Sequence, residues 1–151
     1  MATAAAAQLR RLGELRAQLA PVLSRNERMR IVAHNADLWP VLDLVFDTRQ
    51  RFHVTSAGLA RFLAHGTRVP ADESPRTLED LFRYLAAQPS RHAAALSTVV
   101  RFLERSGIVR DGRVADAHLY AVFARCIDRS LKCGISHKML TSVCATASAS
   151  A

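Results

Sequence analysis

The sequence predicts an all-α fold, a single domain built as an irregular bundle of roughly seven to eight short helices. Half of the 151 residues are hydrophobic, and the chain has only 6 glycines and 5 prolines. This length supports one buried core and is too short for two ordinary domains. We expect a helical domain over residues 1–144 and a flexible, low-complexity tail over residues 145–151.

Capping residues and breaks in the apolar periodicity define the expected elements. Ser24 and Glu27 have the spacing of a capping box, in which each side chain bonds the other residue's backbone amide. The stretch 67–76 has two prolines and no periodicity, so it is expected to be the longest loop. Asp111 and Gly112 predict a tight turn or a small two-stranded ribbon. We expect helices to start at Thr3, Ser24, Asp37, Ser56, Thr77, Pro89, Asp116 and Ser136.

The chain is strongly basic, with a formal net charge of +8. Nearly all of the cations are arginines, because Lys132 and Lys138 are the only lysines. This balance predicts polyanionic partners, nucleic acid before an acidic membrane surface, although a GC-rich genome alone can also enrich arginine. Charged residues interrupt the first apolar stretch, and the three cysteines do not form a disulfide framework. We therefore expect a reducing, cytoplasmic compartment and no membrane partner.

The most informative segment is a long helix expected from about Asp116 to Leu131. Gly134 is expected to close it, and Ser136 is expected to cap a short final helix. Exposed amides at a helix start, with the positive end of its dipole, form a natural phosphate site. The alternative interpretation is a solvated helix face with an ordinary cap. Four residues of the long helix and its end are spaced to share one basic face: His118, Arg125, Arg129 and Lys132.

The stretch LKCGISHKML resembles a signature of the helical DNA-binding domain of ATP-dependent DNA ligases. That signature reads Leu-Arg-x-Gly-hydrophobic-Ser-x-Lys, and the matching positions here are Leu131, Lys132, Gly134, Ile135, Ser136 and Lys138. The stretch NERMRIVAHNADLWPVLDLVFDTRQRFHV is similar to the start of the T-even-phage type of these enzymes. The helix order between the two stretches is also similar, so the resemblance runs from about Leu19 to Val143.

The chain departs from these ligases at two places. Thr141 and Ser142 precede Val143, where the T-even type has an Asn-Lys pair. The Lys-x-Asp-Gly motif that carries the adenylate is absent, since Val109 stands where Asp111-Gly112 would need its lysine. We therefore expect no catalysis by these residues alone and no cofactor, with ATP and Mg²⁺ entering only through a separate catalytic domain. The chain is expected to be either a fragment or a stand-alone relative of the binding domain.

The resemblance implies a non-catalytic module that lies across the minor groove of nicked duplex DNA and supports nick sealing in replication and repair. Little sequence readout is expected from such a phosphate-directed surface. The ligase catalytic domain is the expected second partner, in cis or in trans. The expected DNA contacts are Arg129, Lys132, Ser136, His137 and Lys138, with Gly134 allowing close backbone approach and Arg125, Arg49 and Arg51 as a second set.

Other interpretations remain open at this point. A basic helical adaptor for an acidic protein would differ from a DNA-binding module in showing no salt-dependent DNA binding. A membrane-surface protein acting through residues 4–20 would need an exposed apolar face on the first helix. A zinc site is not expected, because the only histidines and cysteines near the long helix lack the close spacing of structural sites: His118, Cys126, Cys133 and His137.

Overall fold

Helices form almost all of the regular structure in the computed structural model, which confirms the predicted all-α class. The structure describes residues 3–47, 49, 51–87, 92–129, 131 and 135–149. No helix among them is both long enough and apolar enough to cross a membrane. The elements in chain order are α1 (Ala4–Leu19), α2 (Arg25–Ala33), the 3-10 turn η1 (Ala36–Leu38), α3 (Trp39–Phe46), α4 (Ser56–His65), α5 (Leu78–Ala87), α6 (His92–Arg105), β1 (Val109–Arg110), β2 (Arg113–Val114), α7 (Ala117–Ile127) and α8 (His137–Ala149).

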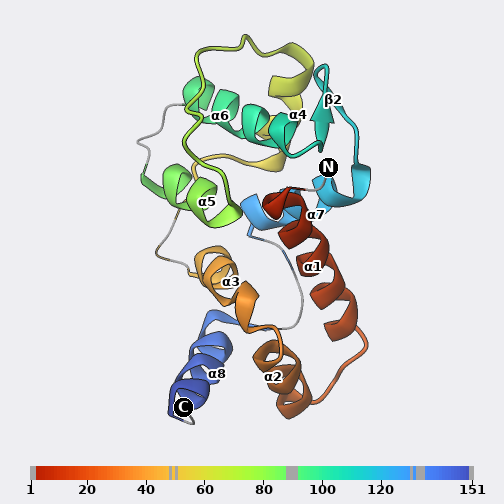
Figure 1. The fold of residues 1–151 in the computed structure, drawn as a ribbon, viewed down its shortest axis with the longest axis vertical. Helices are drawn as coiled ribbons and strands as arrows, with labels where there is room; N and C mark the ends of the chain where they lie inside the picture. Colours follow the sequence, from red (N-terminus) through yellow and green to blue (C-terminus); the bar gives the residue numbers. More distant parts are fainter. Residues whose placement is uncertain are drawn as a thin grey trace.

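The helices gather in two groups that α1 and α7 connect. Figure 1 shows α4, α5 and α6 at one end of the molecule and α2, α3 and α8 at the other. Helix α1 packs along α7, and α3 packs against both α5 and α8. At the centre, the ring of Phe82 stacks on Phe52 with centroids 4.9 Å apart and on Phe123 with centroids 6.2 Å apart. One core therefore joins the two groups.

The apolar faces that the sequence predicts are buried. Every third or fourth residue of α1, from Leu9 to Leu19, has at most 1% of its surface exposed. Burial of a leucine stabilises the fold by about 1.5–3 kcal/mol, so this face fixes α1 against α7. The membrane-surface interpretation needed that face exposed, and in the structure it is buried.

Most of the helix starts predicted on described residues are correct, and the caps explain why; the start predicted at Pro89 lies outside the described residues. The hydroxyl of Thr3 accepts a hydrogen bond from the Ala6 amide at 3.1 Å, and that of Ser24 accepts one from the Glu27 amide at 3.3 Å. The capping box is only half formed, because the Glu27 carboxylate binds Arg30 at 2.5 Å on the exposed face of α2.

The start of the third helix differs from the prediction. Asp37 lies within η1, where its carboxylate pairs with the guanidinium of Arg11 on α1. Helix α3 then begins at Trp39 with no side-chain cap, and Pro40 occupies its first turn. The indole nitrogen of Trp39 donates to the carbonyl of Val32 at 2.8 Å, which fixes α2 to α3. The Asp37 carboxylate, which the sequence predicts as a helix cap, therefore forms a long-range ion pair instead.

The loop over residues 66–76 is irregular, as predicted, and it lies across α6. The side-chain oxygens of the buried Ser97 and Thr98 accept hydrogen bonds from the amides of Val69 and Asp72, at 3.1 and 3.0 Å. After α6, the predicted ribbon is present as the antiparallel pair β1–β2. Its turn residue Asp111 has a φ of 53°, as a tight hairpin turn requires.

The C-terminal helix extends further than predicted. Ser136 caps α8 as expected, since its hydroxyl accepts a hydrogen bond from the Met139 amide at 3.2 Å. The helix continues to Ala149, so residues 145–149, within the stretch predicted as a tail, have a helical backbone. The alanines of this stretch have the highest helix propensity of any residue, which accounts for the extension.

Candidate nucleic-acid interface

Five of the predicted contact residues lie at the place where α3 ends, α7 ends and α8 begins: Arg49, Arg129, Ser136, His137 and Lys138. Helix α7 ends at Ile127 rather than near Leu131, because Arg129 adopts a left-handed backbone with φ of 58°. A residue in this left-handed conformation commonly ends a helix, and it is usually glycine. The predicted terminator, Gly134, lies outside the described residues, as do Lys132 and Cys133.

The side chain of Arg129 turns inward and caps the end of α3. Its Nη2 donates to the carbonyl of Leu44 at 3.1 Å and also to the carbonyl of Asp47. The guanidinium lies 5.1 Å from the ring centroid of Phe52, and its buried Nε has no hydrogen-bond partner. Burial lowers the pKa of Arg129 from its ordinary value. The expectation that Arg129 lies on an exposed basic face is wrong, because the last carbonyls of α3 need a donor and this side chain supplies it.

Asp128, the residue before Arg129, forms hydrogen bonds with the first residue of α4. The Asp128 carboxylate accepts a hydrogen bond from the Ser56 amide at 2.7 Å and another from the Ser56 hydroxyl. The neighbouring Thr55 caps α4 through the Gly58 amide at 3.0 Å. The two-residue turn Asp128–Arg129 therefore forms hydrogen bonds with both the end of α3 and the start of α4.

The start of α8, where the sequence predicts a phosphate site, lies beside this turn. Lys138 is exposed and forms no ion pair with any described residue. The side chain of His137 reaches back to α3, where its Nε2 lies 2.8 Å from Oδ1 of Asp43. A groove of about 440 Å³ lies here, lined by Val45, Phe46, Arg129, Ser136, His137 and Lys138.

The basic connection after α3 borders the same place. Arg49 donates through Nε and Nη2 to the two carboxylate oxygens of Asp47, each at 3.1 Å. These hydrogen bonds lower the pKa of Asp47 to about 2 and raise that of Arg49. The Arg49 side chain is nonetheless 83% exposed, so a second anion in solution can reach its guanidinium. Arg51 is also exposed and makes no ion pair with a described residue.

The three described residues of the predicted basic face of α7 do not form a single surface, and the fourth, Lys132, lies outside the described residues. The imidazole of His118 lies against α1, since a methyl group placed on Gly13 would come within 3.2 Å of its Nε2. Arg125 is half-buried, and Arg129 points inward. The structure therefore brings Ser136, His137, Lys138 and Arg49 around the end of α3, with Arg51 two residues beyond Arg49.

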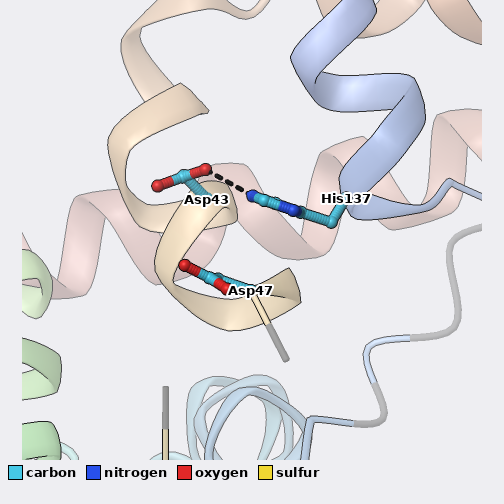
Figure 2. Close-up of side chains that lie close together, drawn as sticks. All are labelled: Asp43, Asp47 and His137. Carbon is cyan, nitrogen blue, oxygen red and sulfur yellow. Dashed lines mark hydrogen bonds and ion pairs between the residues drawn. The ribbon is translucent and has the colours of Figure 1, made fainter. Parts of the chain in front are cut away.

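Two acidic residues that the sequence interpretation missed lie at the centre of this group. Asp43 and Asp47 are one turn apart on α3, and Figure 2 shows the Asp43 carboxylate directed toward the ring of His137. One ligand atom from each of the three residues lies within 4.8 Å of the others. The four-residue spacing is visible in the sequence, but the approach of His137 across 94 positions is not. Of the four residues for which the sequence argues against a zinc site, His137 is in this group and Cys126 is buried in the core, while Cys133 lies outside the described residues.

Comparison of the chain with protein-family models, with curated proteins and with solved structures gave no match.

Proposed function

We propose that this chain is a non-catalytic module that binds duplex DNA through its phosphates, of the kind that ATP-dependent DNA ligases carry. The observation that supports this most is the meeting of three cationic or positively polarised groups around the end of α3. These are the exposed Lys138, the largely exposed Arg49 and the capped N-terminus of the 13-residue helix α8. A helix N-terminus favours an anion, and the two side chains add full charges to it.

The charge that remains after internal pairing also favours a polyanion. Ion pairs among the described residues use only part of the arginine surplus. Arg51 and Lys138 are exposed and have no acidic partner in that part of the chain. Phosphate contacts of this kind carry no base information, so the module is expected to bind DNA without sequence preference. The nick-sealing chemistry would belong to a catalytic domain acting in cis or in trans.

The proposal is tested by fluorescence anisotropy on nicked, intact and scrambled duplexes over a range of salt concentrations. If about five phosphates are neutralised, the logarithm of the affinity should fall with the logarithm of salt with a slope of roughly −4 to −5. Loss of one phosphate contact in Lys138→Ala should flatten that slope by about one.

Arg110→Ala provides a matched control. Arg110 is also exposed and unpaired among the described residues, but it lies in the hairpin, at the end of the molecule away from α8 (Figure 1). Its removal lowers the net charge equally and should leave the slope unchanged. A flat salt response, a strong preference for one sequence, or equal effects of the two variants would contradict the proposal. Competition by polyglutamate as strong as that by DNA would instead favour the acidic-protein adaptor.

A further inference from the structure

We propose that Asp43, Asp47 and His137 form a binding site for a divalent transition-metal ion, and that the bound ion strengthens phosphate binding at the surface around it. The second half of this proposal rests on the proposed DNA-binding function, whereas the metal site itself does not. The site is a mixed nitrogen and oxygen donor set contributed by two helices, α3 and α8, that are far apart in the sequence.

The geometry is close to that of a coordination sphere. Asp43 lies within α3 and Asp47 is the C-cap of that helix, four residues later, and their carboxylates lie close enough together to share a ligand. Nε2 of His137 is already 2.8 Å from Oδ1 of Asp43, and the three donor atoms lie within 4.8 Å of one another. Ligands bound to a metal at about 2.0–2.2 Å lie about 3 Å or slightly more from each other. Rotation of the exposed Asp43 side chain and of the Asp47 side chain would therefore bring the three donor atoms to the separations found around a bound metal ion.

The donor types select the class of ion. Imidazole nitrogen with carboxylate oxygen suits Zn²⁺, Co²⁺ or Mn²⁺, whereas Ca²⁺ and Mg²⁺ prefer oxygen ligands alone. The ion would take the lone pair of Nε2, so a proton on that nitrogen would be released or moved to Nδ1. The side chains of Asp43 and His137 are 57% and 32% exposed, which leaves an entry path for the ion.

Arg49 is the group that competes with the ion. Its guanidinium occupies both oxygens of Asp47, but its side chain is mostly in solvent and can release them. The ion would then add two positive charges beside Lys138 and free Arg49 to contact a phosphate. Metal and DNA should therefore strengthen each other's binding by the same factor, as linkage requires.

The metal site is tested on the metal-free full chain by titration with Co²⁺, followed by visible absorption and by competition with Zn²⁺. We expect one saturable site without a thiolate-to-cobalt charge-transfer band. Asp43→Asn and His137→Gln should each lower the Co²⁺ affinity by about tenfold or more. Arg49→Gln should raise it, because the competing guanidinium is gone. His34→Gln is the matched control, since His34 is an exposed histidine at the end of α2, and it should change nothing.

The coupling is tested by DNA anisotropy with Zn²⁺ and with a chelator. Zn²⁺ should raise the DNA affinity of the wild-type chain and not that of Asp43→Asn. In chelator, Asp43→Asn should bind DNA more tightly than wild type, because a negative charge has been removed from the surface.

Each negative result has a distinct meaning. Unchanged Co²⁺ affinity in both ligand variants, or a thiolate band, would overturn the metal site. DNA binding that ignores Zn²⁺ would overturn the coupling alone. Saturable Co²⁺ binding without any DNA binding would leave the site standing and contradict the proposed function.

Discussion

Replacement of Arg129 by alanine should destabilise the fold, although sequence analysis placed this residue on a solvated face. The change removes hydrogen bonds from a charged donor to the carbonyls of Leu44 and Asp47, and it removes the contact with the ring of Phe52. Hydrogen bonds to charged groups contribute about 1.5–3 kcal/mol and a cation–π contact about 0.5–2 kcal/mol. The buried Nε has no partner, so its removal returns on the order of 1 kcal/mol. Because both hydrogen bonds come from the same Nη2, we count them once, and the terms add to a net loss in the free energy of unfolding of about 1–4 kcal/mol, centred on about 2–3 kcal/mol.

Urea and thermal denaturation, followed by circular dichroism, measure this loss. For a domain of this size, it corresponds to a fall in Tm of roughly 5–10 °C. Arg129→Gly should be less damaging than Arg129→Ala by about 1 kcal/mol, because glycine relieves the left-handed backbone at this position. Arg51→Ala is the control and should cost less than about 0.5 kcal/mol. If Arg129→Ala unfolds like wild type, or if the glycine variant is the weaker of the two, the capping role is refuted.

Two further perturbations address acid stability and the loop over α6. Since the folded-state pKa of Asp47 is lowered to about 2 from its model-compound value of 3.8, its ion pair should stabilise the fold above about pH 4. The difference in stability between wild type and Asp47→Asn should shrink as the pH falls from 4 to 2, and a constant difference in pH-dependent denaturation would contradict this. Thr98→Val should cost about 1–3 kcal/mol and speed hydrogen exchange at the Asp72 amide, which loses its acceptor; unchanged exchange would show that the loop is held by other contacts.

The sequence predicts most helix starts because their signals are local. Thr3, Ser24 and Ser136 bond amides within three residues, so residue type and spacing are sufficient. The errors in the predicted helix ends occur where a contact with a residue distant in the sequence, or an unusual backbone conformation, replaces the local interaction that the sequence predicts. Arg11 engages Asp37 across the fold, and the left-handed turn at Arg129 uses a residue type that carries no local signal for that conformation.

In the candidate site, too, features that depend on local sequence are predicted and features that depend on distant contacts are not. The cap at Ser136 and the exposure of Lys138 follow from the local sequence around the start of α8. The inward course of Arg129 depends on carbonyls 85 and 82 positions away, and the pairing of His137 with Asp43 spans 94 positions. Contacts of this kind depend on how α3, α7 and α8 pack, which periodicity alone does not specify.

The arginine surplus also has a structural role that its net charge conceals. In the part of the chain that the structure describes, guanidinium groups that donate to backbone carbonyls include those of Arg16, Arg28, Arg105 and Arg129. A lysine ammonium lacks the planar guanidinium group, whose several N–H donors point in fixed directions. These positions therefore favour arginine for reasons unrelated to DNA. The net charge of +8 therefore overstates the cations available to a polyanion. The slope of log affinity against log salt reports the ions released where cations contact phosphates, rather than the total charge. It therefore separates cations that bind DNA from arginines that hold the fold together. If net charge alone governed binding, Arg110→Ala and Lys138→Ala would have equal effects; if contacts around α3 govern it, only the lysine variant changes the slope.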